Sequence, residues 1–568
     1  MADELEIRKE LQRWLDQLRQ SRQSYIPYWQ DVKDYICPAR GRFLGGEGVS
    51  EVDNGERNDK KIINSVGTKA LEIMSSGMQS GLTSKARPWF ALGNPDPDLN
   101  NYAPVQQYLK LVVETLTDAF ARSNVYNVFL DVYSEMGAFG PGPMVLLEHP
   151  TKNFYARSYT AGTYWLSSNN HMEVDAMFVM EYMTARQMAQ EYGVERLSSA
   201  ARSAYDQGQY EQKFKVIIAF LKYPVQGLGI ELRSNMTSAA VHFEEGGIRA
   251  NGSDGLLAIR PYRSFPVMAP RWNTIDTDVY GWSPSRMIIG NIKMSQQMER
   301  DKLQGLGKLV SPPMQGPPEL ERRGINASPG GYTAVSGNSE QGIRPLYQVQ
   351  PDIRSLQSGI DRVVQDIKEG YFNDLFMAIR TSDINRRAMT AQEVLSRNDE
   401  AFLILGPVLE RIHYELLDPL IDRAIQILYF NGRIPAPPPE LIKSPPSVEY
   451  ISILSQAQKA VSVGRIEKNM GFIGQMVGVW PQMKEMVDDY AVVAEYAKAT
   501  GLQPGMLRSR EDYQRIVQQQ NAQTQMAQQA KIANDLASGA KTISEADPST
   551  LSGILGSLTG ADNTRMIY

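Results

Sequence analysis

The chain has 568 residues, and its 59 basic and 64 acidic side chains give a formal net charge of −5 at pH 7. With 42% hydrophobic and 22% charged residues, it is neither disordered nor collagen-like, and its length predicts roughly three or four folding units. The single cysteine, Cys37, excludes an internal disulfide, and the acidic balance argues against a protein that clamps nucleic acid by neutralising many phosphates.

The N-terminal part shows the period of amphipathic helices. Leucines recur at helical spacing in the first 22 residues, whose charged side chains also argue against a signal peptide. Further helices are expected from Lys60 to Gly81, from Pro104 onward, and in a third stretch that stops at Gly140. No run of about 18 apolar residues occurs anywhere in the chain, so we expect no membrane span.

The hydrophobic period changes to two between Met144 and Trp272, which indicates strands. A short helix is expected between Thr184 and Tyr192. This region is therefore predicted to be mixed α+β. The strand-like runs are Met144–Glu148, Phe154–Tyr159, Val174–Met183, Phe214–Tyr223 and Ala239–Phe243.

Two long helices are predicted on either side of a segment rich in proline and glycine. Ser283 and Pro284 are an N-cap and a first helical residue, and the helical pattern continues to about Leu309. A second helix is expected after Pro351. The segment between them is too long for a simple connection, so we expect it to be a small functional module.

A polar and basic segment, Ile379–Met389, precedes the last long helix of this region. The sequence Thr390–Glu393 is a capping box that begins this helix, and Pro407 and Pro419 predict kinks in it. The remaining residues, from 440 to 568, are expected to be helical. Their glutamine-rich stretch is either a polar packed helix or a frayed tail.

No motif for catalysis or for metal binding is found. The four histidines lie too far apart in sequence to form a local ligand pair. The Gly307-Lys308 pair lacks the other residues of a phosphate-binding loop, and no G-x-S-x-G elbow occurs. We predict no metal, no cofactor and no catalytic activity.

Several short motifs, taken in their order along the chain, resemble the head-to-tail connector, or portal, proteins of short-tailed bacteriophages. The resemblance covers about three quarters of the chain and is much less distinct in the C-terminal 130 or so residues. Its motifs are Cys37-Pro38-Ala39-Arg40, Ser80-Gly81-Leu82-Thr83-Ser84, Pro88-Trp89-Phe90, Phe139-Gly140, Pro270-Arg271-Trp272, Tyr280-Gly281 and Arg386-Arg387-Ala388-Met389-Thr390-Ala391.

The resemblance implies a mainly α, α+β portal fold that assembles as a dodecameric ring around an axial DNA tunnel at one capsid vertex. The regions that it implies are a wing (1–282, a helical part plus the mixed α+β part), a first stem helix (283–309), a clip (310–350), a second stem helix (351–378), a tunnel loop (379–390), a long kinked wing helix (391–432) and a C-terminal helical crown or barrel (433–568).

Three sets of site residues follow from these regions. In the tunnel loop, Arg380, Arg386 and Arg387 are expected to face DNA, although they could instead pair between subunits or lie in solvent. Docking of other proteins is expected at the clip, and packing between subunits at the stem, although the stem helices could also form an intramolecular hairpin. The clip residues are Pro312, Pro313, Pro317, Arg322 and Arg323, and the stem residues are Met287, Ile292, Met298, Ile360, Val363 and Ile367.

The implied partners are non-specific double-stranded viral DNA, the terminase large subunit, scaffolding protein, the major capsid protein and tail adaptor proteins. The protein is expected in the virion and, during assembly, in the host cytoplasm. The acidic net charge agrees with this function, because a conduit must let a polyanion slide and excess basic charge would hold it. The alternatives are a tail adaptor, an internal ejection protein or, less in keeping with the residues, a nucleic-acid packaging enzyme.

Overall fold

The computed structural model describes most of the chain up to residue 455 and parts of the remainder. The described residues are 4–42, 59–96, 99, 102–222, 230, 235–246, 255–311, 314–315, 344–345, 352–377, 404–455, 469–476, 480, 488–500, 510, 512–520, 522–523, 525–527 and 529–530. The chain divides into two units, Met1–Arg465 and Ile466–Tyr568. The first unit is mainly helical and carries small antiparallel sheets, as the sequence predicts.

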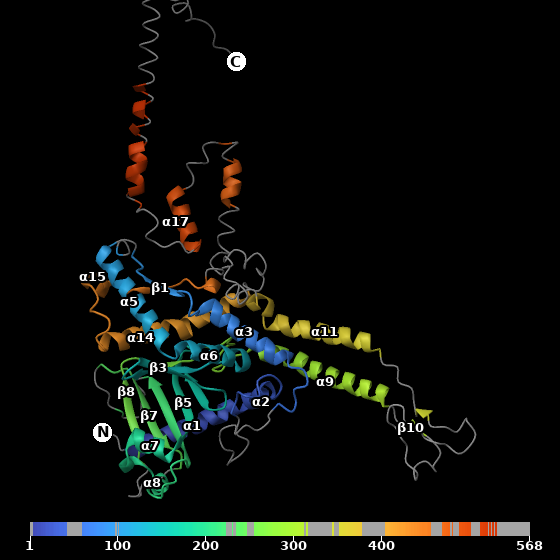
Figure 1. Cartoon of the computed structure of the whole chain (residues 1–568). Helices are drawn as coiled ribbons and strands as arrows, with labels where there is room; N and C mark the ends of the chain where they lie inside the picture. Colours follow the sequence, from blue (N-terminus) through green and yellow to red (C-terminus); the bar gives the residue numbers. More distant parts are fainter. Residues whose placement is uncertain are drawn as a thin grey trace, which may run out of the picture. The chain divides into compact units, whose positions relative to one another are not determined.

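A five-stranded antiparallel sheet forms one part of the first unit (Figure 1). Its order is β4-β5-β6-β7-β8. The predicted strands from 174, 214 and 239 are confirmed, whereas the two edge strands were not predicted. The strands are β4 (Tyr164–Ser168), β5 (Val174–Thr184), β6 (Lys213–Lys222), β7 (Ser238–Glu244) and β8 (Ala258–Tyr262).

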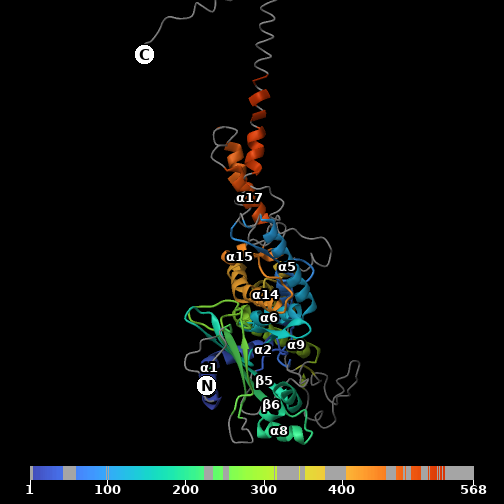
Figure 2. The ribbon, with the colours of Figure 1, turned by 90° about the vertical axis from the view of Figure 1, so that its left-hand side faces the viewer.

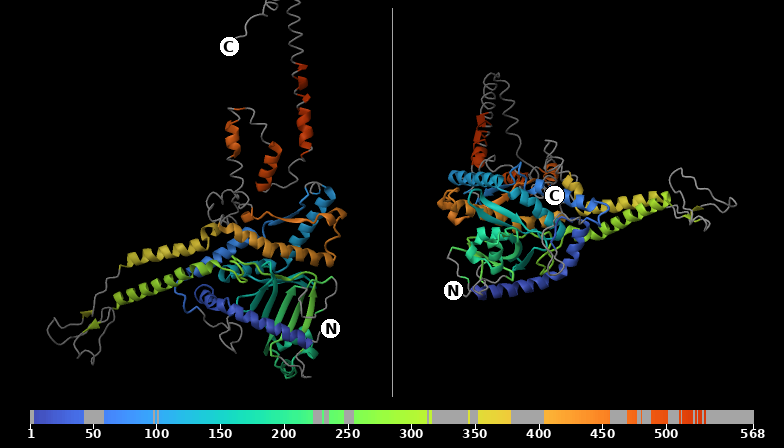
Figure 3. Two further views of the ribbon diagram at one scale, coloured as in Figure 1. Left: turned by 180° about the vertical axis from the view of Figure 1, so that it is seen from behind. Right: turned by 60° about the horizontal axis from the view of Figure 1, so that its bottom comes forward.

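Helix α1 (Glu4–Arg22) covers one face of this sheet (Figure 3, left). Its buried side chains Ile7, Leu11 and Leu15 pack with strand residues such as Phe178 into one cluster. The neighbouring residues of β5 belong to the main core on the other face, because side chains alternate along a strand. The amphipathic pattern at the N-terminus therefore serves to cover the sheet.

Helices α7 (Ala185–Tyr192) and α8 (Ser199–Asp206) connect β5 to β6 and lie at one end of the sheet (Figures 1 and 2). The predicted short helix is α7. It begins with a capping box, in which the Thr184 hydroxyl accepts from the Gln187 amide and the Gln187 side chain accepts from the Thr184 amide.

The main core lies around helix α6 (Val125–Phe139), most of whose side chains are buried. A three-stranded sheet, of order β3-β2-β9, packs beside it. Helix α6 ends at Gly140, whose φ of 110° favours glycine, and a Cβ there would lie 2.9 Å from the Tyr280 carbonyl oxygen. The other elements of this core are α2 (Ile26–Tyr35), α3 (Val66–Leu82), α5 (Ala103–Arg122), β2 (Met144–His149), β3 (Asn153–Ser158) and β9 (Val267–Met268).

A two-stranded ladder joins parts of the chain that are far apart in sequence. Strand β1 (Phe90–Gly93) pairs with β12 (Ser447–Tyr450), and Phe90 lies opposite Tyr450. Helix α14 (Asp418–Phe430) and the short α15 (Pro439–Lys443) come before β12 in the chain. The helix that was predicted to begin at Thr390 is described only from residue 404, so its predicted start lies outside the described residues.

In the second unit, the described residues are largely helical and include α17 (Asp489–Thr500). The glutamine-rich stretch is helical wherever it is described, and its described side chains are mostly exposed. Within this unit, Arg510 Nη2 lies 2.6 Å from Asp488 Oδ2. Among the described residues of the whole chain, no helix combines the length and the apolar composition that crossing a membrane requires.

A buried histidine in the sheet predicts how stability depends on pH. His242 Nδ1 lies 2.9 Å from the Tyr192 hydroxyl, and burial, aided by the Arg260 charge, lowers the pKa of His242 from 6.5 to about 3. Because the unfolded chain takes up this proton first, the contribution of neutral His242 to stability is complete above the unfolded pKa and is lost as pH falls from about 6.5 towards 3. We expect the free energy of unfolding to fall by on the order of a few kcal/mol through this group.

The check compares thermal unfolding of the wild type and of His242→Gln between pH 7 and pH 4. Because other groups titrate in both proteins, only the difference between their two curves reports on His242. As the pH falls, the wild type should lose more stability than His242→Gln, so the midpoint of the wild type minus that of the variant should decrease. Parallel curves would show that His242 is not held neutral in the folded protein.

Candidate functional site

Two helices of the first unit lie side by side and extend away from its core (Figures 1 and 3). They are α9 (Pro284–Val310) and α11 (Ile353–Gly370), and we call them the arm. The predicted helices after Pro284 and after Pro351 are thereby confirmed. Each begins at a side-chain cap, because the Ser283 hydroxyl accepts from the Arg286 amide and the Asp352 carboxylate accepts from the Arg354 and Ser355 amides.

The two arm helices are antiparallel and approach closely where α11 has glycines. A Cβ at Gly370 would lie 2.4 Å from Ile288 Cγ2, and one at Gly359 would lie 3.0 Å from Met298 Cε. Contacts therefore run from the start of α9 to the end of α11 and from the middle of α9 to the middle of α11. The arm is thus a hairpin within one chain.

Buried hydroxyl groups fix the start of α9 against the end of α6. The Ser283 hydroxyl donates to the Ala138 carbonyl over 2.9 Å and also contacts the Tyr28 hydroxyl of α2. Burial raises the pKa of Tyr28, so its hydroxyl stays protonated and can act as a donor. This contact joins α2, α6 and α9.

The end of α11 is tied to the same place. The Ser285 hydroxyl donates to the Gly137 carbonyl over 2.7 Å and lies 2.7 Å from the Tyr371 hydroxyl. Tyr371 is fully buried, which raises its pKa. Both helices of the arm are therefore anchored at one base by hydroxyl groups that are satisfied inside the fold.

The structure places the six predicted stem residues in two environments. Four of them are already buried within one chain: Ile292 and Ile367 are 0% exposed, Ile360 is 1% and Val363 is 6%. Met298 is half-buried against the neighbouring helix, whereas Met287 is 81% exposed. The intramolecular hairpin thus explains most of the apolar stripe, and packing between subunits stays a prediction.

The predicted clip is described only at its two ends. Strand β10 (Met314–Gln315) pairs antiparallel with β11 (Arg344–Pro345), which brings the ends of the segment together. The five predicted docking residues lie outside the described residues. The same is true of Arg380, Arg386 and Arg387 in the predicted tunnel loop.

The long helix that follows the tunnel-loop segment contains a π turn, η4 (His413–Leu417), between helical residues 404–412 and α14. The Asp418 amide donates to the His413 carbonyl, five residues earlier. Pro419, where a kink is predicted, favours the π turn over a regular helix, because proline has no N–H for the Glu415 carbonyl and its ring would clash with that carbonyl in a regular helix.

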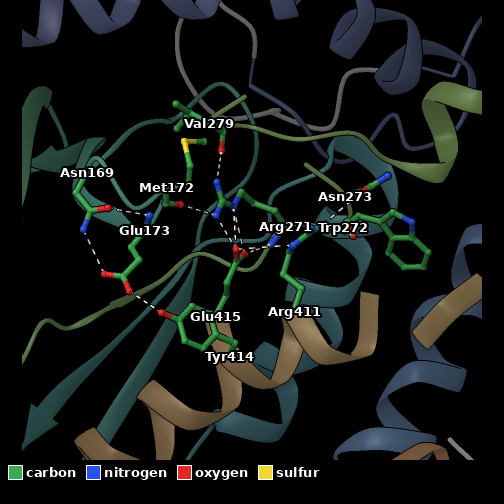
Figure 4. A network of polar contacts seen from close by, with 10 residues as sticks. All are labelled: Asn169, Met172, Glu173, Arg271, Trp272, Asn273, Val279, Arg411, Tyr414 and Glu415. Atoms are coloured by element: carbon green, nitrogen blue, oxygen red, sulfur yellow. Dashed lines mark hydrogen bonds and ion pairs between the residues drawn. The ribbon is translucent and has the colours of Figure 1, made fainter. Parts of the chain in front are cut away.

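A buried ion pair holds this π turn to the segment before α9 (Figure 4). Arg271 Nη2 lies 2.6 Å from Glu415 Oε1, and the Arg271 amide donates to Glu415 Oε2 over 2.9 Å. The side chains of Arg271 and Glu415 are 5% and 13% exposed. Arg271 also donates to the Met172 carbonyl over 2.8 Å, so its charge is well satisfied.

Two further side chains extend this network (Figure 4). Arg411 Nη1 donates to the Trp272 carbonyl over 3.3 Å, and Arg411 Nε lies 4.0 Å from Glu415 Oε1. The Tyr414 hydroxyl donates to Glu173, and this bond is the main reason why the pKa of Glu173 is lowered. The π turn is therefore connected to the turn between β4 and β5.

On another side, the π turn contacts the segment around β12. The His413 ring stacks on the Tyr450 ring with centroids 3.9 Å apart and planes 5° apart. His413 Nε2 lies 3.2 Å from the Ser455 hydroxyl, and the Tyr450 hydroxyl donates to Asp418. Burial is the main cause that raises the pKa of Asp418.

The described part of the chain contains no group of three His, Cys, Asp or Glu side chains that could hold a metal ion. Cys37 is buried, and burial raises the pKa of its thiol, which disfavours a reactive thiolate. The contacts of the arm base and of the π turn hold together segments that are distant in the sequence.

Sequence reasoning missed the Arg271–Glu415 pair, because its members lie 144 positions apart. Two weak signals existed. Arg271 stands in the Pro270-Arg271-Trp272 motif, and Pro419 stands four residues after Glu415, so it cannot donate the helical hydrogen bond to the Glu415 carbonyl. Nothing in the sequence pattern indicated Tyr28 as an anchor of the arm.

Comparison with known proteins gives matches over nearly the whole chain. A family model described as "Bacteriophage head to tail connecting protein" matches residues 8–507. The portal protein of Salmonella phage epsilon15 is 34% identical over 552 residues, which are 96% of this chain and 98% of that protein. A probable portal protein of Bordetella phage BPP-1 is 33% identical over 552 residues, 97% of each chain.

Proposed function

The chain belongs to the family of bacteriophage head-to-tail connecting proteins, and from this premise we propose that it forms a closed ring at one capsid vertex through which DNA is packaged and ejected. It is a structural, non-enzymatic component of the phage virion at the head-tail junction. The observation that carries the proposal is the match to portal proteins over almost the full length of the chain. That match favours a portal over a tail adaptor, an ejection protein or a packaging enzyme.

In this proposal, twelve copies form the ring, and the arm is its stem. The support is that the base of the arm is anchored by the hydroxyl contacts of Ser283 and Ser285, and that its other end leads into the segment closed by β10 and β11. Such an arm can carry the clip away from the wing without unfolding its base. Met287, with 81% of its surface exposed, is the stem residue with most surface left for a neighbouring subunit.

The DNA contact is proposed to be weak. The whole chain carries a net charge of −5, so each ring has no excess of cations that would hold a duplex by counterion release. The tunnel-loop arginines Arg380, Arg386 and Arg387 supply local, transient phosphate contacts. Weak contact lets DNA slide in both directions.

We expect that the double variant Arg386→Glu/Arg387→Glu assembles as the wild type does but packages or retains less DNA. The reason is that each Arg→Glu replacement changes the charge by −2, so the charge beside the phosphates changes by −4 per subunit. The measurement is the amount of DNA protected from nuclease in assembled particles. The matched control is Lys110→Glu/Arg122→Glu on α5, whose side chains are 79% and 74% exposed. Loss of the ring, with packaging otherwise unchanged, would contradict the assignment.

The clip is proposed as the docking surface for the terminase large subunit during packaging and for tail adaptors afterwards, while scaffolding and major capsid proteins contact the ring during assembly. We expect that Arg322→Glu/Arg323→Glu weakens binding of terminase to the purified ring and leaves the thermal unfolding of the chain unchanged. A binding assay with purified terminase provides the measurement. Normal binding by a fully folded variant would remove these two residues from the docking surface.

A further inference from the structure

The π turn His413–Leu417 contacts three different parts of the first unit at once. Glu415 is bound by Arg271, which precedes the arm. Tyr414 donates to Glu173 in the turn between β4 and β5. His413 stacks on Tyr450 of β12. A single turn of helix therefore links the arm base, the sheet and the last described strand before the second unit.

This turn has an alternative register. In the structure, the Asp418 amide donates to the His413 carbonyl; in a regular α-helix it would donate to the Tyr414 carbonyl. Moving from one register to the other displaces the preceding residues by one position, which is a rotation of about 100° around the helix axis. After such a shift, either the contacts of the π turn would break or residues 404–412 would move.

Each register offers Glu415 a cation. In the observed register, Arg271 binds its carboxylate, and the Arg411 Nε lies 4.0 Å away. Arg411 stands four residues before Glu415, which is the spacing at which opposite charges pair on a regular helix. Arg411 would therefore pair with the carboxylate after a shift, while the Arg271 guanidinium would keep its bonds to the carbonyls of Met172 and Val279 and lose its carboxylate partner. The loss of that buried pair is the cost that favours the observed register.

Strand β12 provides the contacts that favour the π register. The Tyr450 ring covers His413, and its hydroxyl donates to Asp418, the residue whose amide defines the register. These two contacts lie on both sides of the π turn, so they hold its ends at a fixed separation. Tyr450 is itself held by the pairing of β12 with β1.

We propose that the π turn His413–Leu417 is a register switch that β12 holds in the π state through Tyr450. Release of Tyr450 lets the turn convert to the α register, with a kink at Pro419 that relieves the clash of its ring with the Glu415 carbonyl. Residues 404–412 then rotate relative to α14. The switch itself needs only contacts of the described residues. Any effect of this rotation on DNA rests on the proposed function, because residues 404–412 follow the segment proposed to line the tunnel.

Hydrogen exchange of the full-length purified protein, without DNA or other virion proteins, tests the switch. In Tyr450→Ala, we expect the amides of residues 404–417 to exchange about tenfold faster than in the wild type, because the turn samples both registers. In Tyr450→Phe, which keeps the ring and loses the bond to Asp418, we expect a smaller increase in the same residues. The matched control is Val448→Ala, which truncates a side chain two residues earlier on β12 and leaves Tyr450 in place.

A second variant examines the register directly. Pro419→Ala restores an N–H for the Glu415 carbonyl and removes the clash that disfavours the α register. In a cryo-EM map of Pro419→Ala/Tyr450→Phe, we expect the Asp418 amide beside the Tyr414 carbonyl and Glu415 beside Arg411. A map in which the π turn and the Arg271–Glu415 pair persist would overturn the proposal.

The proposal is also overturned if Tyr450→Ala and Val448→Ala change exchange equally in residues 404–417. If Tyr450→Ala fails to fold, the comparison of Tyr450→Phe with the wild type decides in the same way. Ring formation is scored separately by imaging. A register shift in a protein that forms no ring would retain the switch and reject the proposed function, and a ring without a shift would do the reverse.

Discussion

Replacing Arg271 by methionine is expected to destabilise the first unit by about 3 to 5 kcal/mol. Methionine fills much of the space of the arginine but removes the cation that binds the Glu415 carboxylate, which is 13% exposed, and the Arg411 Nε stays 4.0 Å away in the observed register. It also removes the bond to the Met172 carbonyl. The loss would appear as a lower midpoint of thermal or urea unfolding.

The control for this prediction is the double variant Arg271→Met/Glu415→Gln. It removes both charges, and the glutamine side-chain oxygen can still accept from the Arg271 backbone amide, whose acceptor is Glu415 Oε2 at 2.9 Å. Because the large cost comes from the uncompensated charge, we expect the double variant to recover most of the lost stability. If it is as unstable as Arg271→Met alone, the pair is not what holds the π turn to the segment before the arm.

Replacing Val363 by proline is expected to break α11 and to prevent ring assembly. Val363 is 6% exposed in the interior of this helix, and a proline there removes a helical hydrogen bond and clashes with the carbonyl of Gly359. The cost is about 3 kcal/mol or more per subunit. Helix content by circular dichroism and ring formation by negative-stain imaging would both report the change.

The matched control places proline in the same helix at a position that tolerates it. Ile353 is the first residue of α11, where the N–H has no helical acceptor. We expect Ile353→Pro to retain the helix and the ring. An unaltered oligomer in Val363→Pro would count against α11 as a structural part of the ring.

Local signals predicted the elements that depend on local chemistry. Ser283 before Pro284 and the Thr184–Gln187 capping box mark helix starts because a side chain satisfies the free amides of the first turn, and both helices begin where these residues indicate. The stop at Gly140 was predicted for the same kind of reason. The mainly helical α+β composition followed from the change of hydrophobic period at Met144.

Features that depend on distant pairing could not be predicted. Strands β1 and β12 are short and lie about 350 positions apart, and a four-residue run carries too little periodicity to specify a partner. Edge strand β8 contains Pro261. A proline in the sequence argues against a strand, although an edge strand tolerates it. The apolar stripe of α11 was assigned to subunit packing because its pattern alone cannot distinguish a neighbouring helix of the same chain from one of another copy.

Imaging of the purified full-length chain at high concentration decides whether the protein acts as a conduit. The proposed function predicts closed rings with a central hole wide enough for duplex DNA, seen end-on in negative stain or by cryo-EM. Solitary monomers without an axial hole, persisting when the chain is concentrated or assembled with capsid shell proteins, would contradict it.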